Sequence, residues 1–492
     1  MMKYKFNVKV FFLFPFLFIS SCNDSFVDIE PEYSIDSENY FNVPGDYDQA
    51  LIAAYDLLQT TYLNSMLGEI ASDNSFCGGE SATDVPGFQQ IDDMIHTPNN
   101  DNLQDLWDWM FAGVQRATYI IEFKDKIDFN GKEKLIAEAY FLRAYYNFEL
   151  VKWFGPIPIK PLARFAVGDE TKIPRSSIQE VYSFIEKDLL LAIESLPFNV
   201  SQMGRASLGA AKSLLGKAYL YQEKFTESAL ILDEVIDSGL YRLENDYELI
   251  FEQDGENGIG SIFEVQYSDL EGASFDCFQC SEGNIAVGFN GIRQYNGPLF
   301  DSGFSFNVLT EELVGEFELG DKRKDVAVLD IRSWAAKTGA TYAVGYEHTG
   351  YFNRKYIARK GDSNIGDQNL TNPNNYRAIR YADVLLMAAE AHVKKASPNN
   401  SKARTYLNLV RSRAFGNDLR AITFSNNELA NAIFRERRVE LAGEGHRFFD
   451  LVRTGIAQNE INGFTANKNE IFPIPLEEIQ FSNGNWNQNP GY

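Results

Sequence analysis

The stretch ASLGAAKSLLGKAYLYQEKFTESALILDEVIDSG (206–239) decides the fold class of this 492-residue chain. Its apolar and small residues have the spacing of two helices that pack closely against each other: Leu215, Gly216, Tyr219, Phe225, Leu232 and Val235. Gly216 allows the two helices to approach, and Tyr219 fills the gap beside it. The stretch therefore predicts an antiparallel helix pair.

Those positions are also the signature positions of a tetratricopeptide repeat, although Ser228 stands where the repeat usually has Ala. Comparable pairs are expected from 47–63 with 106–123, from 132–154 with 177–196, and from 381–395 with 402–414. Ser177 and Glu180 form a capping box at the start of one of these helices. The chain is therefore expected to be mainly α, with about four tetratricopeptide-like helix pairs. A generic helical bundle is the alternative.

Two regions of the chain have the composition of loops. From about 245 to 375, Gly, Asn, Asp and Ser are frequent, and only 261–267 alternates like a strand. A shorter region, 71–103, interrupts the first helix pair. Long loops on a rigid scaffold usually carry binding residues, so a loop-rich ligand-binding insertion is expected here.

The N-terminus is typical of an exported lipoprotein. Lys3, Lys5 and Lys9 precede an apolar run over 10–19, which is too short to cross a bilayer. The sequence ISSC (19–22) resembles a bacterial lipobox, in which the cysteine is lipidated after cleavage. Residues 1–21 are therefore expected to be a lipoprotein signal peptide and Cys22 the lipidated residue. An ordinary signal peptide with a stray cysteine is the alternative.

Composition and cysteine usage exclude several classes of function. The formal net charge of −24 is unsuited to nucleic acid, which requires basic patches. Beyond Cys22 only Cys77, Cys277 and Cys280 remain, so no disulfide framework is possible. The C-x-x-C at 277–280 lacks the further ligands that a zinc site needs. We expect no metal or cofactor. We expect the two cysteines of this motif to form a local disulfide, or one of them to pair with Cys77.

The segment FRERRVELAGEGHRFFD (434–450) is dense in charge. One reading makes His446 a catalytic base beside Glu444. The other reading is an ion-pair lattice that ties this segment to the body, and we favour it because no nucleophile motif is present. Arg143 and Arg380 lie inside apolar helices and are expected to lock the core through paired carboxylates. The tryptophans of the N-terminal helices are expected in the core as well: Trp107, Trp109 and Trp153.

Six segments, in order, resemble the SusD/RagB family of surface lipoproteins. They are EIASDNSFCGG (69–79), AEAYFLRAYYNFELVKWFGPIPIK (137–160), GFSFNVLTEELVGEFELGDKRKD (303–325), NYRAIRYADVLLMAAEAH (375–392), FRERRVELAGEGHRFFDLVRTG (434–455) and NEIFPIPLEEIQFSNGNWNQNPGY (469–492). The resemblance covers nearly all of the chain after the leader. It divides that part into an N-terminal region with tetratricopeptide-like repeats, 22–235, and a C-terminal region with the insertion, 236–492.

The resemblance implies a non-catalytic binding protein, held on the outer membrane by the lipid on Cys22 and facing the cell surface. It implies a partner, a SusC-like TonB-dependent transporter, to which the protein delivers oligo- or polysaccharide. A peptide-binding import subunit of the RagB type is the alternative. A surface glycosidase is disfavoured because catalytic motifs are absent.

Sugars are bound by aromatic rings that stack on their C–H faces and by polar groups that bond their hydroxyls. Trp334 is placed in a loop because no apolar stripe surrounds it, and it is expected to be the central ring. The candidate ligand-binding residues are polar groups and aromatic rings in the loop regions: Asp73, Asn74, Phe76, Phe88, Tyr267, Phe278, Tyr295 and Trp334.

Overall fold

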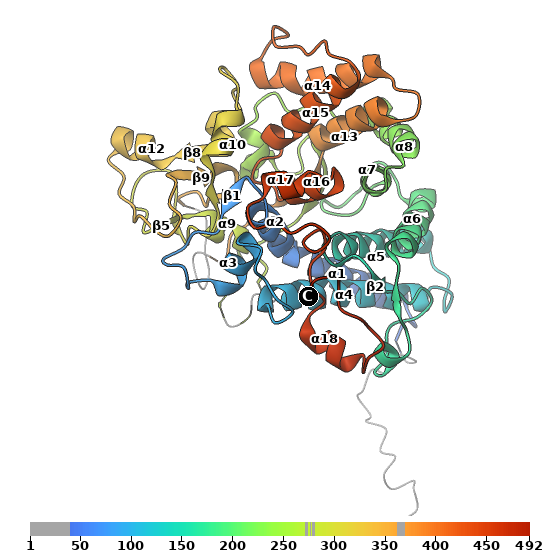
Figure 1. Cartoon of the computed structure of the whole chain (residues 1–492). Coiled ribbons are helices and arrows are strands. Elements are labelled where there is room, and N and C mark those ends of the chain that lie inside the picture. The colour runs from blue at the N-terminus through green and yellow to red at the C-terminus, as the bar shows by residue number, and fades with distance from the viewer. Residues whose placement is uncertain (1–39, 271–273, 276, 278–280, 362–369) are drawn as a thin grey trace, which may run out of the picture.

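The computed structural model describes residues 40–270, 274–275, 277, 281–361 and 370–492. Most of the helical residues lie in four antiparallel pairs on one side of the molecule (Figure 1). The pairs are α1 (Pro44–Asp56) with α4 (Asp101–Glu122), α5 (Lys132–Phe154) with α6 (Ile178–Ser195), α7 (Leu208–Tyr221) with α8 (Phe225–Asp237), and α13 (Tyr381–Lys394) with α14 (Asn400–Phe415). The mainly α fold and the four predicted helix pairs are confirmed.

Local signals explain where several of these helices begin and how closely they pack. The Ser177 hydroxyl accepts the backbone N–H of Glu180, and the Glu180 carboxylate accepts the N–H of Ser177, which is the capping box at the start of α6. At Gly216, a Cβ would lie 2.4 Å from the side chain of Leu232 on α8. The close approach of α7 and α8 therefore requires glycine at this position.

The first predicted helix, 47–63, is not continuous. It is divided into α1, a short 3₁₀ segment (Leu57–Thr60) and α2 (Thr61–Ile70). α2 is buried over nearly its whole length and packs against α16 (Arg447–Arg453) and α9 (Ile285–Asn290). The break allows the chain to leave the helix pair and enter the loop-rich side of the molecule.

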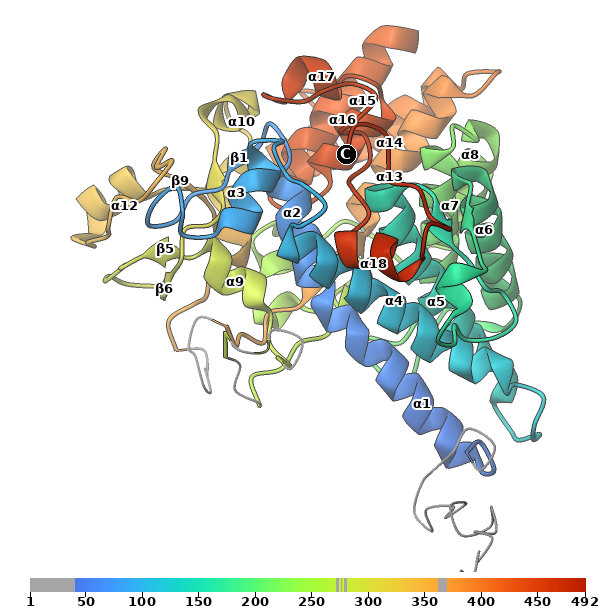
Figure 2. The ribbon, with the colours of Figure 1, turned by 60° about the horizontal axis from the view of Figure 1, so that its bottom comes forward.

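The region between α8 and α13 forms that loop-rich side (Figures 1 and 2). A small sheet has the strand order β1 (Ser75–Phe76), β7 (Val308–Leu309), β9 (Tyr351–Asn353) and β8 (Val328–Asp330), and all of its pairings are antiparallel. Short helices surround it: α3 (Pro86–Asp92), α9, α10 (Glu311–Glu316), α11 (Lys324–Ala327) and α12 (Ile331–Thr338). A further pair of short strands on this side is β5 (Ile292–Arg293) with β6 (Ser302–Gly303), whereas β2 (Ile157–Pro158) and β3 (Arg175–Ser176) form a pair beside α5.

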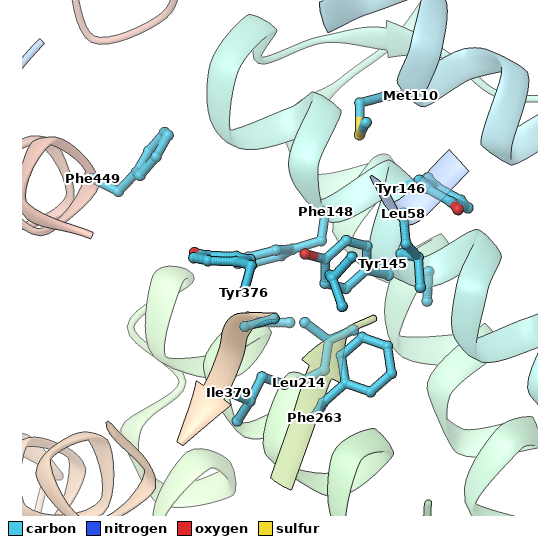
Figure 3. Close-up of a cluster of buried hydrophobic side chains, with 14 of the residues drawn as sticks. Leu58, Met110, Tyr145, Tyr146, Phe148, Leu214, Phe263, Tyr376, Ile379 and Phe449 are labelled. Carbon is cyan, nitrogen blue, oxygen red and sulfur yellow. The ribbon is translucent and has the colours of Figure 1, made fainter. Parts of the chain in front are cut away.

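The predicted strand at 261–267 is observed as β4 (Ser261–Val265), which pairs with β10 (Tyr376–Arg380). Its residues do not alternate between core and solvent, because β4 and β10 are enclosed by the helix pairs. Figure 3 shows Phe263 of β4 and Ile379 of β10 beside Leu214 of α7 and Tyr145 of α5. Buried apolar residues from both ends of the chain form this main core.

The part of the chain after α14 lies against both the helix pairs and the loop-rich side. α15 (Asn426–Glu440), α16 and α17 (Ala457–Glu460) lie between the helix pairs and the small sheet, and α18 (Leu476–Phe481) lies near α4 (Figures 1 and 2). Within the described residues, no helix is both long enough and apolar enough to cross a membrane.

Candidate functional site

A cleft of about 520 Å³ opens where the loop after α2 meets the small sheet and the C-terminal helices. We call it the Phe76 cleft. Six parts of the chain line it: 72–76, the end of α3, the start of α10, the loop at 346–347, α15, and 460–462. Its volume lies in the range typical of ligand sites, about 300–1,000 Å³. Two of the predicted ligand residues, Asp73 and Phe76, are among its lining residues.

Two aromatic rings line this cleft. Phe76 lies on β1, where Ser75 is buried and Phe76 is 37% exposed, as alternation along a strand requires. Tyr346 is half-buried and comes from the loop before β9. Gln89, Thr310 and Asn462 add polar atoms to the lining. A surface that combines accessible ring area with amides, hydroxyls and carboxylates suits a ligand with apolar C–H faces and many hydroxyl groups.

Asp73 and Asn74 brace the cleft more than they present free groups to it. The Asp73 carboxylate accepts two hydrogen bonds from Arg447, at 2.7 and 2.8 Å, and forms an ion pair with Arg438 at 2.9 Å. The Asn74 side chain is buried; it accepts a bond from Arg438 Nε and donates one to Glu69. Both residues were predicted to bind ligand. Asp73 lines the cleft, whereas Asn74 is buried and is not among the lining residues; ligand binding by either residue stays a prediction.

Glu69 joins two of the segments that carried the family resemblance. Its buried carboxylate accepts the backbone N–H groups of Gly443 and Gly445, each at 3.0 Å. Gly445 has a φ of +78°, and a Cβ there would lie 2.6 Å from the backbone oxygen of Ser65. The turn after α15 therefore requires glycine, and it fixes the loop that carries Asp73 and Phe76. Burial raises the pKa of Glu69 to about 7.

Asp92 is the most strongly perturbed carboxyl group of the lining. Burial raises its pKa to about 7, although the backbone N–H of Cys77 donates to the carboxylate at 2.8 Å. The negative charges of Asp93 and Glu347 raise it further. Near neutral pH, Asp92 therefore exists in both protonation states. It can either donate a hydrogen bond to a hydroxyl group in the cleft or accept one from it.

Three other predicted aromatic residues are buried, which corrects the expectation that they present free rings. Phe88 packs edge-on against Phe289, with the ring centroids 5.6 Å apart. Tyr267 is enclosed by the main core, and its hydroxyl donates to the carbonyl of Gln59 at 2.7 Å. Tyr295 donates to the carbonyl of Pro298 at 2.6 Å. A ring whose faces are covered by other side chains cannot stack on a sugar.

Trp334 lies on a helix, α12, and not in a loop. Its indole N–H donates to the Tyr295 hydroxyl at 2.8 Å, and its ring packs against Phe300 with the centroids 5.3 Å apart. The half-buried side chain covers a second, smaller hydrophobic cluster and does not line the Phe76 cleft. The N-cap residue Asp330 and Gly339, in the left-handed conformation at the helix end, were the local signals for this helix.

The remaining predicted positions have different outcomes. Cys22, Phe278 and Cys280 lie outside the described residues. Cys277 is disulfide-bonded and Cys77 is a free, buried thiol, so the alternative in which Cys77 pairs with the C-x-x-C motif is wrong. In the part of the chain that the structure describes, no group of three or more His, Cys, Asp or Glu side chains could hold a metal ion.

Sequence reasoning missed most of the cleft. Tyr346, Gln89, Asp92 and Arg438 all line it, together with the segment 460–462. Arg438 was recognised only as one charge among many in 434–450. Tyr346 follows a glycine in a loop rich in aromatic residues, TYAVGYEHTGYF (341–352), and this was the one local signal available.

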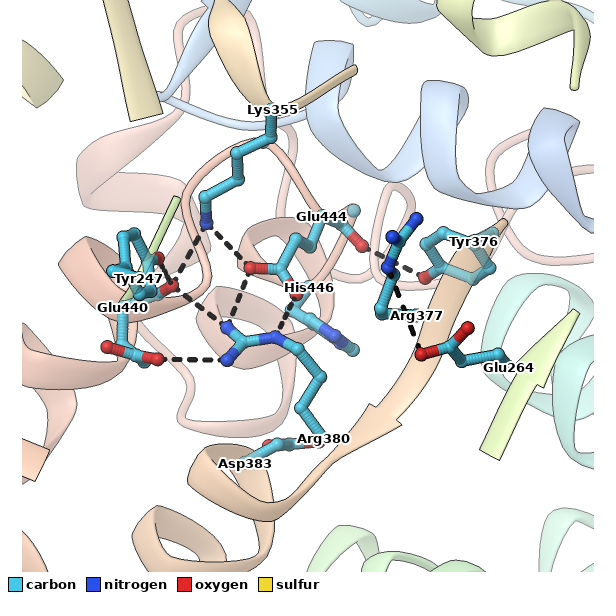
Figure 4. Close-up of polar contacts among 12 residues, drawn as sticks. Tyr247, Glu264, Lys355, Tyr376, Arg377, Arg380, Asp383, Glu440, Glu444 and His446 are labelled. Atoms are coloured by element: carbon cyan, nitrogen blue, oxygen red, sulfur yellow. Dashed lines mark hydrogen bonds and ion pairs between the residues drawn. The ribbon is translucent and has the colours of Figure 1, made fainter. Parts of the chain in front are cut away.

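The charged segment 434–450 takes part in a buried ion-pair lattice (Figure 4). This confirms the interpretation in which its charges tie the segment to the body of the protein. Glu444 binds Lys355 at 2.6 Å and Arg380 at 2.8 Å. Glu440 forms ion pairs with three arginines at 2.7–2.9 Å: Arg323, Arg380 and Arg413. The lattice connects α15, β10 and the loop-rich side. The predicted core roles of Arg143, which pairs with Asp188 at 2.7 Å, and of the three tryptophans are also confirmed.

His446 belongs to the same buried region. Burial lowers its pKa well below the usual value, and the nearby Lys217 ammonium, 3.4 Å from Nδ1, lowers it further. The imidazole is therefore neutral and bonded inside the core. It does not line the Phe76 cleft.

A second cleft, about 680 Å³ in volume, lies between α10, α14 and α15. We call it the α15 cleft. Its arginines are engaged with carboxylates, such as Arg411 with Glu318 at 2.8 Å and Arg435 with Glu316 at 3.2 Å. Phe424 is the aromatic ring among its lining residues and is 47% exposed. The Phe76 cleft differs from the α15 cleft in having two aromatic rings, Phe76 and Tyr346, among its lining residues.

Comparison with known proteins assigns the chain to a family. Residues 330–492 match the model of the SusD family, and residues 25–220 match a model described as starch-binding, associating with outer membrane. SusD-like protein P2 from Formosa agariphila is 27% identical to this chain over an alignment covering 98% of this chain and 99% of that protein. SusD-like protein P38 from the same organism is 28% identical, with coverage of 96% and 97%.

Solved structures agree. A laminarin-binding SusD-like protein is 34% identical and superposes with a TM-score of 0.84, covering 91% of this chain and 99% of the other. Surface glycan-binding protein A from Bacteroides thetaiotaomicron, solved in complex with laminarihexaose, is 25% identical with a TM-score of 0.80 and the same coverage. The order of the six sequence segments, the four helix pairs and these matches agree with one another, and the chain therefore belongs to the SusD family.

Proposed function

We propose that this protein binds a glycan in the Phe76 cleft. The observation that carries the proposal is the combination, in one open cleft, of the exposed ring of Phe76, the half-buried ring of Tyr346 and a polar lining. The laminarin-binding relative and the laminarihexaose complex support a glycan as the ligand class. Laminarin, a neutral glucan, is therefore the first ligand to test.

The expected affinity is moderate. Each aromatic contact contributes about 0.5–1.5 kcal/mol beyond its buried area, and ordering of the ligand offsets part of this gain. Two rings and a few hydrogen bonds correspond to a Kd of roughly µM to mM. Such affinities suit a protein that captures a polymer and releases it to a second component.

We further propose that the protein is held at the outer membrane by a lipid on Cys22, faces the cell surface, and delivers its ligand to a SusC-like TonB-dependent transporter. The lipobox-like ISSC sequence supports the anchor, and the family model's description supports the location. Two or more acyl chains on one cysteine would make attachment durable. The protein is proposed to have no catalytic activity, so laminarin incubated with it should be recovered unchanged.

The decisive experiment compares two exposed phenylalanines in different clefts. Phe76→Ala should weaken laminarin binding about 5- to 150-fold in isothermal titration, the range for losing a central aromatic anchor of about 1–3 kcal/mol. Phe424→Ala, in the α15 cleft, is the matched control and should bind laminarin like the parent protein.

Other outcomes would point elsewhere. Loss of binding in Phe424→Ala but not in Phe76→Ala would move the site to the α15 cleft. If laminarin, starch, mannan and xyloglucan all fail to bind while a mixture of oligopeptides does bind, the glycan proposal is wrong and the peptide-binding alternative replaces it.

A further inference from the structure

The carboxylates of the Phe76 cleft greatly outnumber its cations. Six acidic residues line it: Asp73, Asp92, Asp93, Glu312, Glu347 and Glu460. Arg438 is the basic residue among the described lining residues. The protein as a whole also carries a negative formal net charge, −24.

Arg438 is not free to bind an anionic ligand. Its Nε donates to the Asn74 side-chain oxygen at 2.9 Å, and its Nη2 lies 2.9 Å from the Asp73 carboxylate and donates to the Asp73 carbonyl at 3.2 Å. Its Nη1 lies 3.8 Å from Glu316. Two of the three guanidinium nitrogens therefore already donate to acceptors of the protein, and the third lies near a carboxylate. An anionic ligand would have to break these contacts to reach the guanidinium group.

The carboxylates differ in how far their charge is compensated. Asp73 is paired with both Arg447 and Arg438. Among the residues that the structure describes, no Lys, Arg or His nitrogen lies within 4.0 Å of the other five carboxylates. Four of these five are exposed, and we call them the rim carboxylates: Asp93, Glu312, Glu347 and Glu460.

We infer that the Phe76 cleft is selective for neutral glycans and rejects polyanionic ones, such as sulfated or uronate-rich polymers. The inference rests on the proposed function, because it concerns the ligand class of the same site. Bringing a sulfate or carboxylate beside several unpaired carboxylates places like charges together without a compensating cation, and such juxtaposition strongly disfavours a partner. A neutral sugar hydroxyl, by contrast, can donate a hydrogen bond to each rim carboxylate.

The test uses polymers that share a backbone and differ in charge: laminarin with laminarin sulfate, and dextran with dextran sulfate. Affinity electrophoresis and isothermal titration at 50 mM NaCl should show at least tenfold weaker binding of the sulfated member of any pair whose neutral member binds. The difference should shrink at 500 mM NaCl, because salt screens exposed charges over a few ångströms.

A variant with the four rim carboxylates converted to their amides, D93N/E312Q/E347Q/E460Q, should lose most of the discrimination between the neutral and the sulfated polymer. The control removes the same number of charges from exposed acidic residues elsewhere, which have no ion pair in the structure, and should keep the discrimination: D48N/E133Q/E227Q/D418N. Comparing the two variants separates the local field of the cleft from the net charge of the protein.

Each outcome has a clear meaning. Equal or tighter binding of the sulfated polymer would overturn the inference and leave the proposed glycan function intact. The inference would also be overturned if the sulfated polymer bound in the presence of calcium and EDTA abolished this binding, because a bridging cation would then compensate the charge. Loss of discrimination in the control variant as well as in the rim variant would also overturn it. If neither member of any pair binds, the proposed function itself fails, and the inference fails with it.

Discussion

Trp334→Ala distinguishes a ring that packs from a ring that binds. In the structure, the indole covers the smaller hydrophobic cluster, packs at a tilt against Phe300 and donates a hydrogen bond to Tyr295. Truncating a fully buried Trp costs about 3–5 kcal/mol, and a half-buried one should cost about half of that. Loss of the hydrogen bond adds about 1 kcal/mol. The free energy of unfolding should therefore fall by about 2.5–3.5 kcal/mol.

The assay is urea denaturation followed by far-UV circular dichroism, because removing a tryptophan alters the fluorescence signal itself. Hydrogen exchange of the β8 and β9 amides gives a second reading, since the cluster can open locally without unfolding the helix pairs. Trp334→Phe is the matched control: it keeps a ring against Phe300 but loses the N–H donor, so about 1 kcal/mol should be lost. Laminarin affinity should stay within twofold of the parent protein in both variants.

One result would refute this reasoning. If Trp334→Ala left the stability and the hydrogen exchange unchanged and weakened laminarin binding fivefold or more, Trp334 would contact the ligand. The expectation drawn from the sequence, in which Trp334 is the central ligand-binding ring, would then be right, and the assignment of the site to the Phe76 cleft would need revision.

Three further predictions each concern one residue. Glu440→Gln should lower the free energy of unfolding at pH 7 by about 3–5 kcal/mol, measured by urea denaturation, because the charges of three buried arginines would no longer be fully compensated. The control is Asp128→Asn, at a side chain that is 98% exposed, and it should not move the urea midpoint. Burial raises the pKa of Glu440, but the three arginines outweigh it and hold the pKa well below its ordinary value, so the loss should be full above about pH 5 and shrink as the pH falls below about 4. Gly445→Ala should destabilise the protein more than Gly455→Ala, because both have positive φ but only Gly445 has a backbone atom in the space of the added methyl group; equal urea midpoints would contradict this. Cys22→Ala should leave the folded protein outside the outer-membrane fraction, and co-sedimentation with outer membranes in a strain lacking the transporter would exclude the lipid anchor.

Local pattern determined the helices of this protein. The capping box of α6, the apolar faces of α5 and α13, and the tetratricopeptide-like spacing of α7 and α8 each involve residues three or four positions apart, and such residues lie side by side on one helix whatever the rest of the chain does. Tryptophans and Arg143 inside apolar helices could be assigned to the core for the same reason, whereas Arg380 was wrongly placed in a helix: it is buried at the end of strand β10. The ordered segments along the chain were enough to recognise the family.

The candidate binding cleft could not be derived in this way. Whether a loop aromatic is free depends on which distant side chains cover it, and Phe76 and Phe88 are alike in sequence context, yet Phe289 covers only Phe88. Asp73 is fixed by Arg447 and Arg438, which are more than 360 positions away in the chain. Their approach is imposed by the glycine turn after α15 and its contact with Glu69. Exposure and charge pairing are properties of long-range packing, so the tertiary structure alone decided which residues form the cleft and which of its charges remain uncompensated.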